Sequence, residues 1–320
     1  MIKVCIELKL FTLDGVMASL LDLFRSSFSP QTGRSSYIVD GFFIKKYADR
    51  HECAYEYAVL RKIATADPTI FLVPKVFKMS TSSGYSSIVM ERIEGNPLQN
   101  FTMNFLLFKE SEALKIFNGL GKALRELHYI NLKGLHNGFF PDSLQKIKLE
   151  IFNLSRTLGA LNVLDHKFRD KILNIIKGVN HINDEIFANV NLHGEFYFTH
   201  ILLSKNKYVF FDFHNACKGP SYFDLAMLST SLYASITLPF YTPRQLTQLI
   251  HAFLTGYHGE RLNDKMFKSI KLAELYVTVR EILTYARDLH GPLFINKLLA
   301  MLKIRRLKTA IEEVILPNLT

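Results

Sequence analysis

The residues best suited to chemistry are concentrated between positions 189 and 233, where two carboxylates and a histidine stand next to short apolar runs. Glu195 and His200 lie in one loop, and Asp212 directly follows the apolar run Tyr208–Phe211. A carboxylate that closes an apolar strand is costly unless it is paired or bound to a metal ion. Because carboxylate and imidazole groups also accept protons, the spacing predicts acid–base chemistry beside a metal site.

Phosphoryl transfer needs this kind of set. One residue orients or deprotonates the attacking hydroxyl group, metal ligands hold Mg²⁺ against the phosphates, and a cation neutralises the developing charge. With Glu195 and His200 on a short loop and Asp212 at a strand end, the three side chains are expected to converge on one cleft wall. His193 is predicted to brace the loop through hydrogen bonds. The same role is predicted for Asp224, which stands at the start of a helix that begins Asp-Leu-Ala.

The elements that position these residues fall into a β-rich first third and a helical remainder. Strands are predicted over Tyr37–Val39, Phe42–Lys46, Val73–Met79 and Ser86–Arg92, with a tight turn at Asp40-Gly41 and a helix over 51–65. Later helices are predicted over 108–131, 143–157, 166–178, 221–236, 243–258, 264–288 and 292–315, interrupted by short strands within 188–216. A further helix is predicted from Leu13 to Phe24. The change from predicted strands to predicted helices near residue 95 indicates two lobes with a ligand-binding cleft between them.

The stretch 189–228 resembles the catalytic segment of the protein-kinase-like superfamily, in its aminoglycoside and choline phosphotransferase branch. That branch carries HGDxxxxN, a strand ending in Asp, and a GxxxxDLA helix. The sequences HGEFYFTHILL and DFHNA resemble more closely the bacterial lipopolysaccharide core heptose and Kdo kinases, which read HRDFYxxHxLL and DxHxA. The resemblance implies an α+β, bilobal protein-kinase-like fold, with a small β-rich N-lobe over residues 1–92 and a larger helical C-lobe over 93–320.

The resemblance also implies a role for each site residue, with ATP and Mg²⁺ as cofactors. Glu195 is the catalytic residue that accepts the hydroxyl proton, and Asp212 and His200 hold the metal ion. His200 has an alternative role as a hydrogen-bond donor to phosphate. The nucleotide is expected to contact Lys45, its ion-pair partner Glu56, and main-chain groups of Met90, Glu91 and Arg92. Lys46 is the alternative to Lys45, because a shift of one residue moves the side chain to the other face of the strand.

Two departures from the family pattern bear on activity. Glu195 stands where the family has Asp, and misplacing a catalytic group slightly can cost on the order of 100-fold in rate. Only Gly33 marks the phosphate loop. The favoured function is phosphorylation of a sugar or small-molecule hydroxyl, with a lipopolysaccharide core heptose or Kdo as acceptor. The alternatives are a pseudokinase that binds nucleotide or a partner without turnover, and an aminoglycoside-type, choline-type or protein Ser/Thr kinase.

Composition narrows the partners and the location. The formal net charge of +10 suits an acidic partner, but no nucleic-acid readout module accompanies it, so nucleic acid is not expected. Three scattered cysteines, no leader and no spanning segment predict a cytoplasmic protein, with or without peripheral contact at the inner membrane face. A C-terminal basic cluster is interpreted as a solvated face or as a contact with an anionic membrane or a lipid-linked acceptor: Lys297, Lys303, Arg305, Arg306 and Lys308.

Overall fold

The computed structural model describes residues 34–98, 110–235, 242–289, 291 and 293–320. The predicted helix at Leu13–Phe24, and also Gly33, lie outside the described residues. The chain divides into two compact units, one of Met1–Ala54 with Phe77–Glu91 and the other of Tyr55–Val76 with Arg92–Thr320. Strands dominate the first unit and helices the second, so the predicted α+β class is confirmed.

The first unit contains a four-stranded sheet in the order β1-β2-β5-β4. Strands β1 (Arg34–Val39) and β2 (Phe42–Tyr47) form the predicted hairpin, and positive φ angles at Asp40 and Gly41 make its tight turn. The remaining strands are β4 (Val76–Ser82) and β5 (Tyr85–Glu91). The prediction of a strand over Val73–Met79 is wrong at its start, because Pro74 has no N–H to donate to a sheet.

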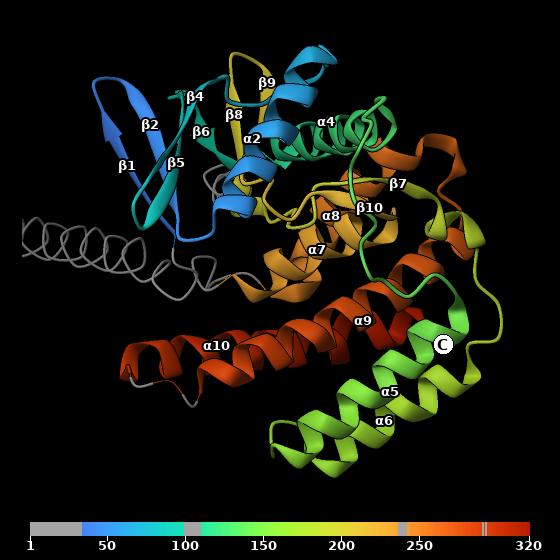
Figure 1. Ribbon diagram of the computed structural model, residues 1–320. Coiled ribbons are helices and arrows are strands. Elements are labelled where there is room, and N and C mark those ends of the chain that lie inside the picture. Colours follow the sequence, from blue (N-terminus) through green and yellow to red (C-terminus); the bar gives the residue numbers. More distant parts are fainter. Residues whose placement is uncertain (1–33, 99–109, 236–241, 290, 292) are drawn as a thin grey trace, which may run out of the picture. The chain divides into compact units, whose positions relative to one another are not determined.

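The second unit is built mainly from the predicted helices. Their observed bounds are α2 (Arg50–Thr65, which begins in the first unit), α4 (Glu110–Tyr129), α5 (Leu144–Ala160), α6 (His166–Gly178), α7 (Tyr222–Ala234), α8 (Pro243–His258), α9 (Asp264–Asp288) and α10 (Phe294–Ala310). Side-chain caps explain several of the starts: Ser143, Asp165, Thr242 and Asn263 each accept a hydrogen bond from a backbone N–H in the first turn. Figure 1 shows α9 and α10 side by side, and α5 beside α6.

The core of this unit centres on α7, whose residues are all buried. Helix α4 crosses α8 so closely that a Cβ added to Gly256 would lie 1.8 Å from the carbonyl oxygen of Asn118. Only glycine allows the two backbones to approach this far. The packed helices thereby support the short strands and loops that carry the predicted site.

Candidate functional site

Two small strand pairings bring the chemically interesting loops together. Strand β7 (Asn189–Leu192) pairs with β10 (Cys217–Pro220), which places His193 beside the end of the loop that precedes Cys217. Strand β8 (Ile201–Ser204) pairs with β9 (Lys207–Phe210), which places His200 beside the start of the same loop. The two pairings therefore bring the loop with Glu195 next to the loop with Asp212. Burial, followed by the charge of Asp224, raises the pKa of the Cys217 thiol to about 12.

Asp224 fixes the first of these loops. The side chain is fully buried, and its oxygens accept hydrogen bonds from the backbone N–H groups of His193 (2.7 Å) and Gly194 (3.0 Å). The same carboxylate lies 3.1 Å from Nε2 of His128 on α4, whose Nδ1 is 2.6 Å from the hydroxyl of Tyr257 on α8. This is the geometry that a bracing role requires.

Gly194 is the position in the loop that only glycine can occupy. Its φ is +87°, and a Cβ there would lie 2.1 Å from the carbonyl oxygen of Asn215. The loop carrying Glu195 and the loop carrying Asp212 therefore touch through backbone, with no side chain between them.

Glu195 is held by side chains of the second loop. Its Oε1 accepts a hydrogen bond of 2.7 Å from Nδ2 of Asn215 and lies 3.6 Å from Nε2 of His214. Burial opposes ionisation of Glu195, but the hydrogen bond and charge of His214 outweigh it and hold the pKa of the carboxyl below its usual value. The carboxylate is thus ionised and oriented, as a proton acceptor must be.

Asp212 adopts a left-handed backbone conformation with φ of 72°, which is uncommon outside glycine and often found at functional sites. Its Oδ1 lies 2.6 Å from Nδ1 of His214. Burial lowers the pKa of His214, but the hydrogen bonds to Asp212 and Glu195 prevail and raise it to about 9. His214 is therefore a cation that links the two carboxylates.

Glu195, His200 and Asp212 meet as the sequence predicts. Each offers one ligand atom, and these atoms all lie within 4.8 Å of one another. Nδ1 of His200 lies 3.1 Å from the carbonyl oxygen of Glu195, which can only accept, so Nδ1 is the donor of this hydrogen bond. The other ring nitrogen, Nε2, lies 3.8 Å from Oδ2 of Asp212. An imidazole nitrogen and two carboxylates form a donor set that fits a divalent cation.

His193 lies behind this group. Its ring is fully buried, and Nε2 donates a hydrogen bond of 3.0 Å to the carbonyl oxygen of Phe211. Burial is the main reason that its pKa falls to about 4. A neutral, buried ring that ties the two loops together has a supporting position.

The predicted nucleotide-side residues occupy several elements. Glu56 on α2 is buried, and its Oε1 accepts a hydrogen bond of 3.2 Å from the backbone N–H of Phe213. On β2, Nζ of Lys46 lies over the rings of Tyr37 (5.0 Å) and Tyr85 (4.5 Å), whereas Lys45 lies 5.2 Å from the ring of Tyr47. Met90 and Glu91 end β5, and Arg92 follows that strand.

Four neighbours of the site have no role predicted from the sequence: His214, Asn215, Tyr197 and Glu281. His214 appeared only as part of the DFHNA resemblance, and Asn215 had no signal because its contact with Glu195 depends on the fold. On α9, Oε2 of Glu281 lies 3.4 Å from the hydroxyl of Tyr197. Burial is the largest reason that the pKa of Glu281 rises to about 6, and Glu195 adds to the shift. Nothing in the α9 sequence distinguishes this glutamate from a surface residue.

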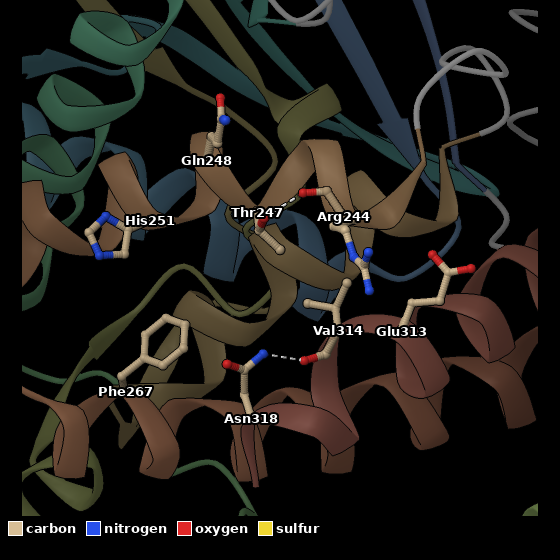
Figure 2. A pocket seen from close by; sticks show the side chains of 8 residues that line it. All are labelled: Arg244, Thr247, Gln248, His251, Phe267, Glu313, Val314 and Asn318. Carbon is tan, nitrogen blue, oxygen red and sulfur yellow. Dashed lines mark hydrogen bonds between the residues drawn. The ribbon is translucent and has the colours of Figure 1, made fainter.

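A surface hollow of about 430 Å³ lies between α8, α9 and the C-terminal residues, and none of the predicted site residues lines it (Figure 2). Several of its polar groups bond within the protein; Asn318, for example, donates to the carbonyl oxygen of Val314 at 2.6 Å. The lining includes one imidazole, His251, and one carboxylate, Glu313, but among the described residues these do not belong to a group of three ligand atoms such as the one above.

A family comparison agrees with this geometry. The model of the family APH, described as the phosphotransferase enzyme family, matches residues 28–262. The chain belongs to the phosphotransferase enzyme family. The matched range contains every residue of the carboxylate and imidazole group, and also Lys45, Glu56 and Asp224.

Solved structures of similar fold include a choline/ethanolamine kinase family protein and aminoglycoside phosphotransferases. A choline/ethanolamine kinase family protein from Mesorhizobium loti has 14% identity and a TM-score of 0.58, covering 91% of this chain and 89% of that one. An aminoglycoside 2'-phosphotransferase-IIIa in complex with GDP has 12% identity and a TM-score of 0.61, covering 87% and 91%. A mutant aminoglycoside phosphotransferase bound to ADP and hygromycin B has 12% identity and a TM-score of 0.55, covering 89% and 92%.

At these identities the structural likeness establishes the fold of this phosphotransferase-family chain, which is the predicted protein-kinase-like fold. Among curated proteins, no sequence matches the chain significantly. The expected relation to lipopolysaccharide core kinases therefore rests on the sequence resemblance alone. Of the helices that the structure describes, none has both the length and the apolar character needed to span a membrane.

Proposed function

We propose that this chain transfers the γ-phosphoryl group of ATP to a hydroxyl group of a sugar or small molecule. The observation that carries the proposal is the convergence of Glu195, His200 and Asp212 within 4.8 Å, in a chain of the phosphotransferase enzyme family. Phosphoryl transfer depends mainly on positioning and on charge stabilisation, so a braced loop with ionised carboxylates suits it.

Each residue of the group has a distinct role in this proposal. Glu195 accepts the proton of the attacking hydroxyl, because His214 keeps its carboxylate ionised and Asn215 orients it. Asp212 and Nε2 of His200 would hold Mg²⁺, which would neutralise charge on the phosphates. His193 and Asp224 keep the two loops in place.

The nucleotide side is supported by the family and by the residues of β2 and β5. Two structures of similar fold contain GDP or ADP, which makes a purine nucleotide the natural ligand to test. We propose Lys45 as the phosphate contact and Glu56 as its partner, because the FFIKKY strand and the YEYAVLRKI helix that carry them resemble the corresponding segments of the family. The main chain at Met90, Glu91 and Arg92 is proposed to hold the adenine.

For the acceptor, we favour a lipopolysaccharide core heptose or Kdo. The support is the Phe196-Tyr197 pair, the histidine at position 200 and the histidine at position 214, which all follow that subgroup. An aminoglycoside or a choline-like alcohol fits the fold equally well, because the relatives with this fold include kinases of both kinds.

The test is thermal unfolding of the wild type and of Asp212→Asn with ATP, with Mg²⁺ and with both. A ligand that binds only the native state raises the melting temperature. We expect a Mg²⁺-dependent ATP shift of several degrees in the wild type, no such shift in Asp212→Asn, and a normal shift in the control Asp170→Asn, whose carboxylate is exposed. The absence of any shift in the wild type, or an unchanged shift in Asp212→Asn, would overturn the proposal.

A further inference from the structure

Helix α10 is apolar on two opposite faces. One face is buried against α7, α8 and α9, and its residues are at most 7% exposed: Ala300, Ile304, Leu307 and Ala310. The other side carries large apolar residues that are 38–78% exposed: Phe294, Ile295, Leu298, Met301 and Leu302. This second set is called the α10 apolar face below.

Helical geometry makes the α10 apolar face continuous. Phe294, Leu298, Met301 and Leu302 follow the spacing i, i+4, i+7 and i+8, which places their side chains on one side of a helix. A helix that is apolar all round is normally buried on all sides. A contiguous exposed patch of this kind marks a surface that contacts another apolar phase or a partner.

The charged residues of α10 indicate what the α10 apolar face contacts. The helix has five cationic and no acidic residues. Three of the predicted basic cluster are held by the rest of the unit: Lys303 over the ring of Tyr285, Arg306 by the carbonyl oxygen of Tyr233, and Lys308 over the ring of Phe168. The interpretation of all five as one solvated face is therefore wrong.

Two cations remain with the α10 apolar face. Arg305 is exposed and continues the row of Phe294, Leu298 and Met301 by one more turn, and half-buried Lys297 borders the row. A surface that is apolar in the middle with cations beside it complements a layer that is apolar inside and anionic at its headgroups.

We propose that the α10 apolar face docks on the surface of an anionic lipid bilayer. Apolar side chains enter the headgroup–acyl boundary without needing a shaped pocket, and cations beside them are attracted to an anionic surface. A two-fold contact between copies of this chain would instead place like charges of the same face together, and the net charge of +10 adds to that repulsion. The proposal stands independently of phosphotransfer, although a membrane contact would bring a lipid-linked acceptor near the enzyme.

The test is co-sedimentation of the full chain with vesicles of phosphatidylcholine alone or mixed with phosphatidylglycerol. We expect binding to the mixed vesicles, and at least a tenfold loss in the double variant Leu298→Glu with Met301→Glu. The matched control replaces Leu149 and Leu161, which are 57% and 44% exposed, with Glu and should bind as the wild type does. Equal melting temperatures establish that the variants are folded.

A second arm separates charge from apolar contact. Lys297→Gln with Arg305→Gln should remove the preference for phosphatidylglycerol, and high salt should do the same to the wild type. Equal binding by the wild type and the Leu298/Met301 variant, or no binding by the wild type, overturns the proposal. A wild-type dimer in light scattering that becomes a monomer in that variant, with no vesicle binding, would assign the face to self-association instead.

Discussion

At the scale of single residues, the buried carboxylate of Asp224 connects the loop of the site to helix α4. It receives hydrogen bonds from two backbone N–H groups of the loop and contacts His128. Asp224→Asn presents an N–H group to one of these donors, so we expect the free energy of unfolding to fall by about 2–3 kcal/mol. Urea denaturation measures this, with exposed Asp264→Asn as control; an equal effect in both variants would contradict the bracing role.

Glu195 occupies the loop position where the family pattern has aspartate. The Glu195 carboxylate accepts a hydrogen bond of 2.7 Å from Asn215. Aspartate is shorter by one methylene group, so Glu195→Asp should move the carboxylate out of reach of this donor. We expect the rate of ADP formation from ATP to fall by on the order of 10- to 100-fold in Glu195→Asp and further in Glu195→Gln. Measuring ADP avoids the need to know the acceptor. Faster turnover in Glu195→Asp would instead identify glutamate as a substitution that weakens the enzyme.

Residue types predicted the central group but not its immediate partners. Glu195, His200 and Asp212 stand in loops beside short apolar strands, so their spacing was enough to predict that they lie close together. Asn215 and Glu281 are ordinary residues in sequence, and their contacts depend on strand pairing and on the position of α9. The roles of the central group remain predictions that the binding and turnover experiments test.

At the scale of elements, the crossing of α4 and α8 depends on two glycines, Gly121 on α4 and Gly256 on α8. A methyl group at Gly256 would overlap the backbone of α4, so Gly256→Ala should force the helices apart. We expect a loss of about 3 kcal/mol or more in the free energy of unfolding. Gly178→Ala is the control, since nothing lies within 4 Å of a Cβ there. Similar denaturation midpoints for the two variants would show that the crossing adapts.

Helix α9 contains a buried ion pair. Nζ of Lys271 lies 2.7 Å from Oε2 of Glu274, and both side chains are at most 1% exposed. Lys271→Met leaves a carboxylate without its partner and should cost about 3–5 kcal/mol, whereas adding Glu274→Leu should restore much of the loss. Denaturation of the single and double variants measures both effects. A double variant no more stable than the single one would contradict this.

The bounds of long helices were predictable because capping residues and apolar periodicity agree over many residues. The predicted helices over 166–178, 243–258 and 264–288 match α6, α8 and α9. The two-residue strands Phe71–Leu72 and Asn96–Pro97 were missed, since such short pairings leave no periodic pattern. The expected helix over 292–315 ends at Ala310 in the structure, where a wider helical turn follows.

At the scale of the whole molecule, buried neutral histidines make stability depend on pH. Burial, and then the charge of Arg261, lowers the pKa of His258 to about 4, against an ordinary value of 6.5. The unfolded chain therefore takes up a proton that the folded chain refuses, and stability falls as pH decreases from about 6.5 toward 4. The expected loss from this residue is on the order of 3 kcal/mol at the acid end.

His258→Gln should flatten this decline, and the exposed His251→Gln should leave it unchanged. Urea denaturation at several pH values over about three pH units, from neutral to the acid end, measures the difference. Equal slopes for the wild type and His258→Gln would assign the acid sensitivity to other groups, such as the paired carboxylates of the site.

The strand pairing of β7 with β10 has a practical consequence through Cys217. Its thiol is 3% exposed, and a pKa of about 12 keeps it protonated at neutral pH. Alkylating reagents attack the thiolate, so they modify this position only when the pairing opens. Cys217 is thus a natural probe of local unfolding. Timed labelling with iodoacetamide, followed by peptide mass spectrometry, measures how often the pairing of β7 with β10 opens, without any engineered cysteine.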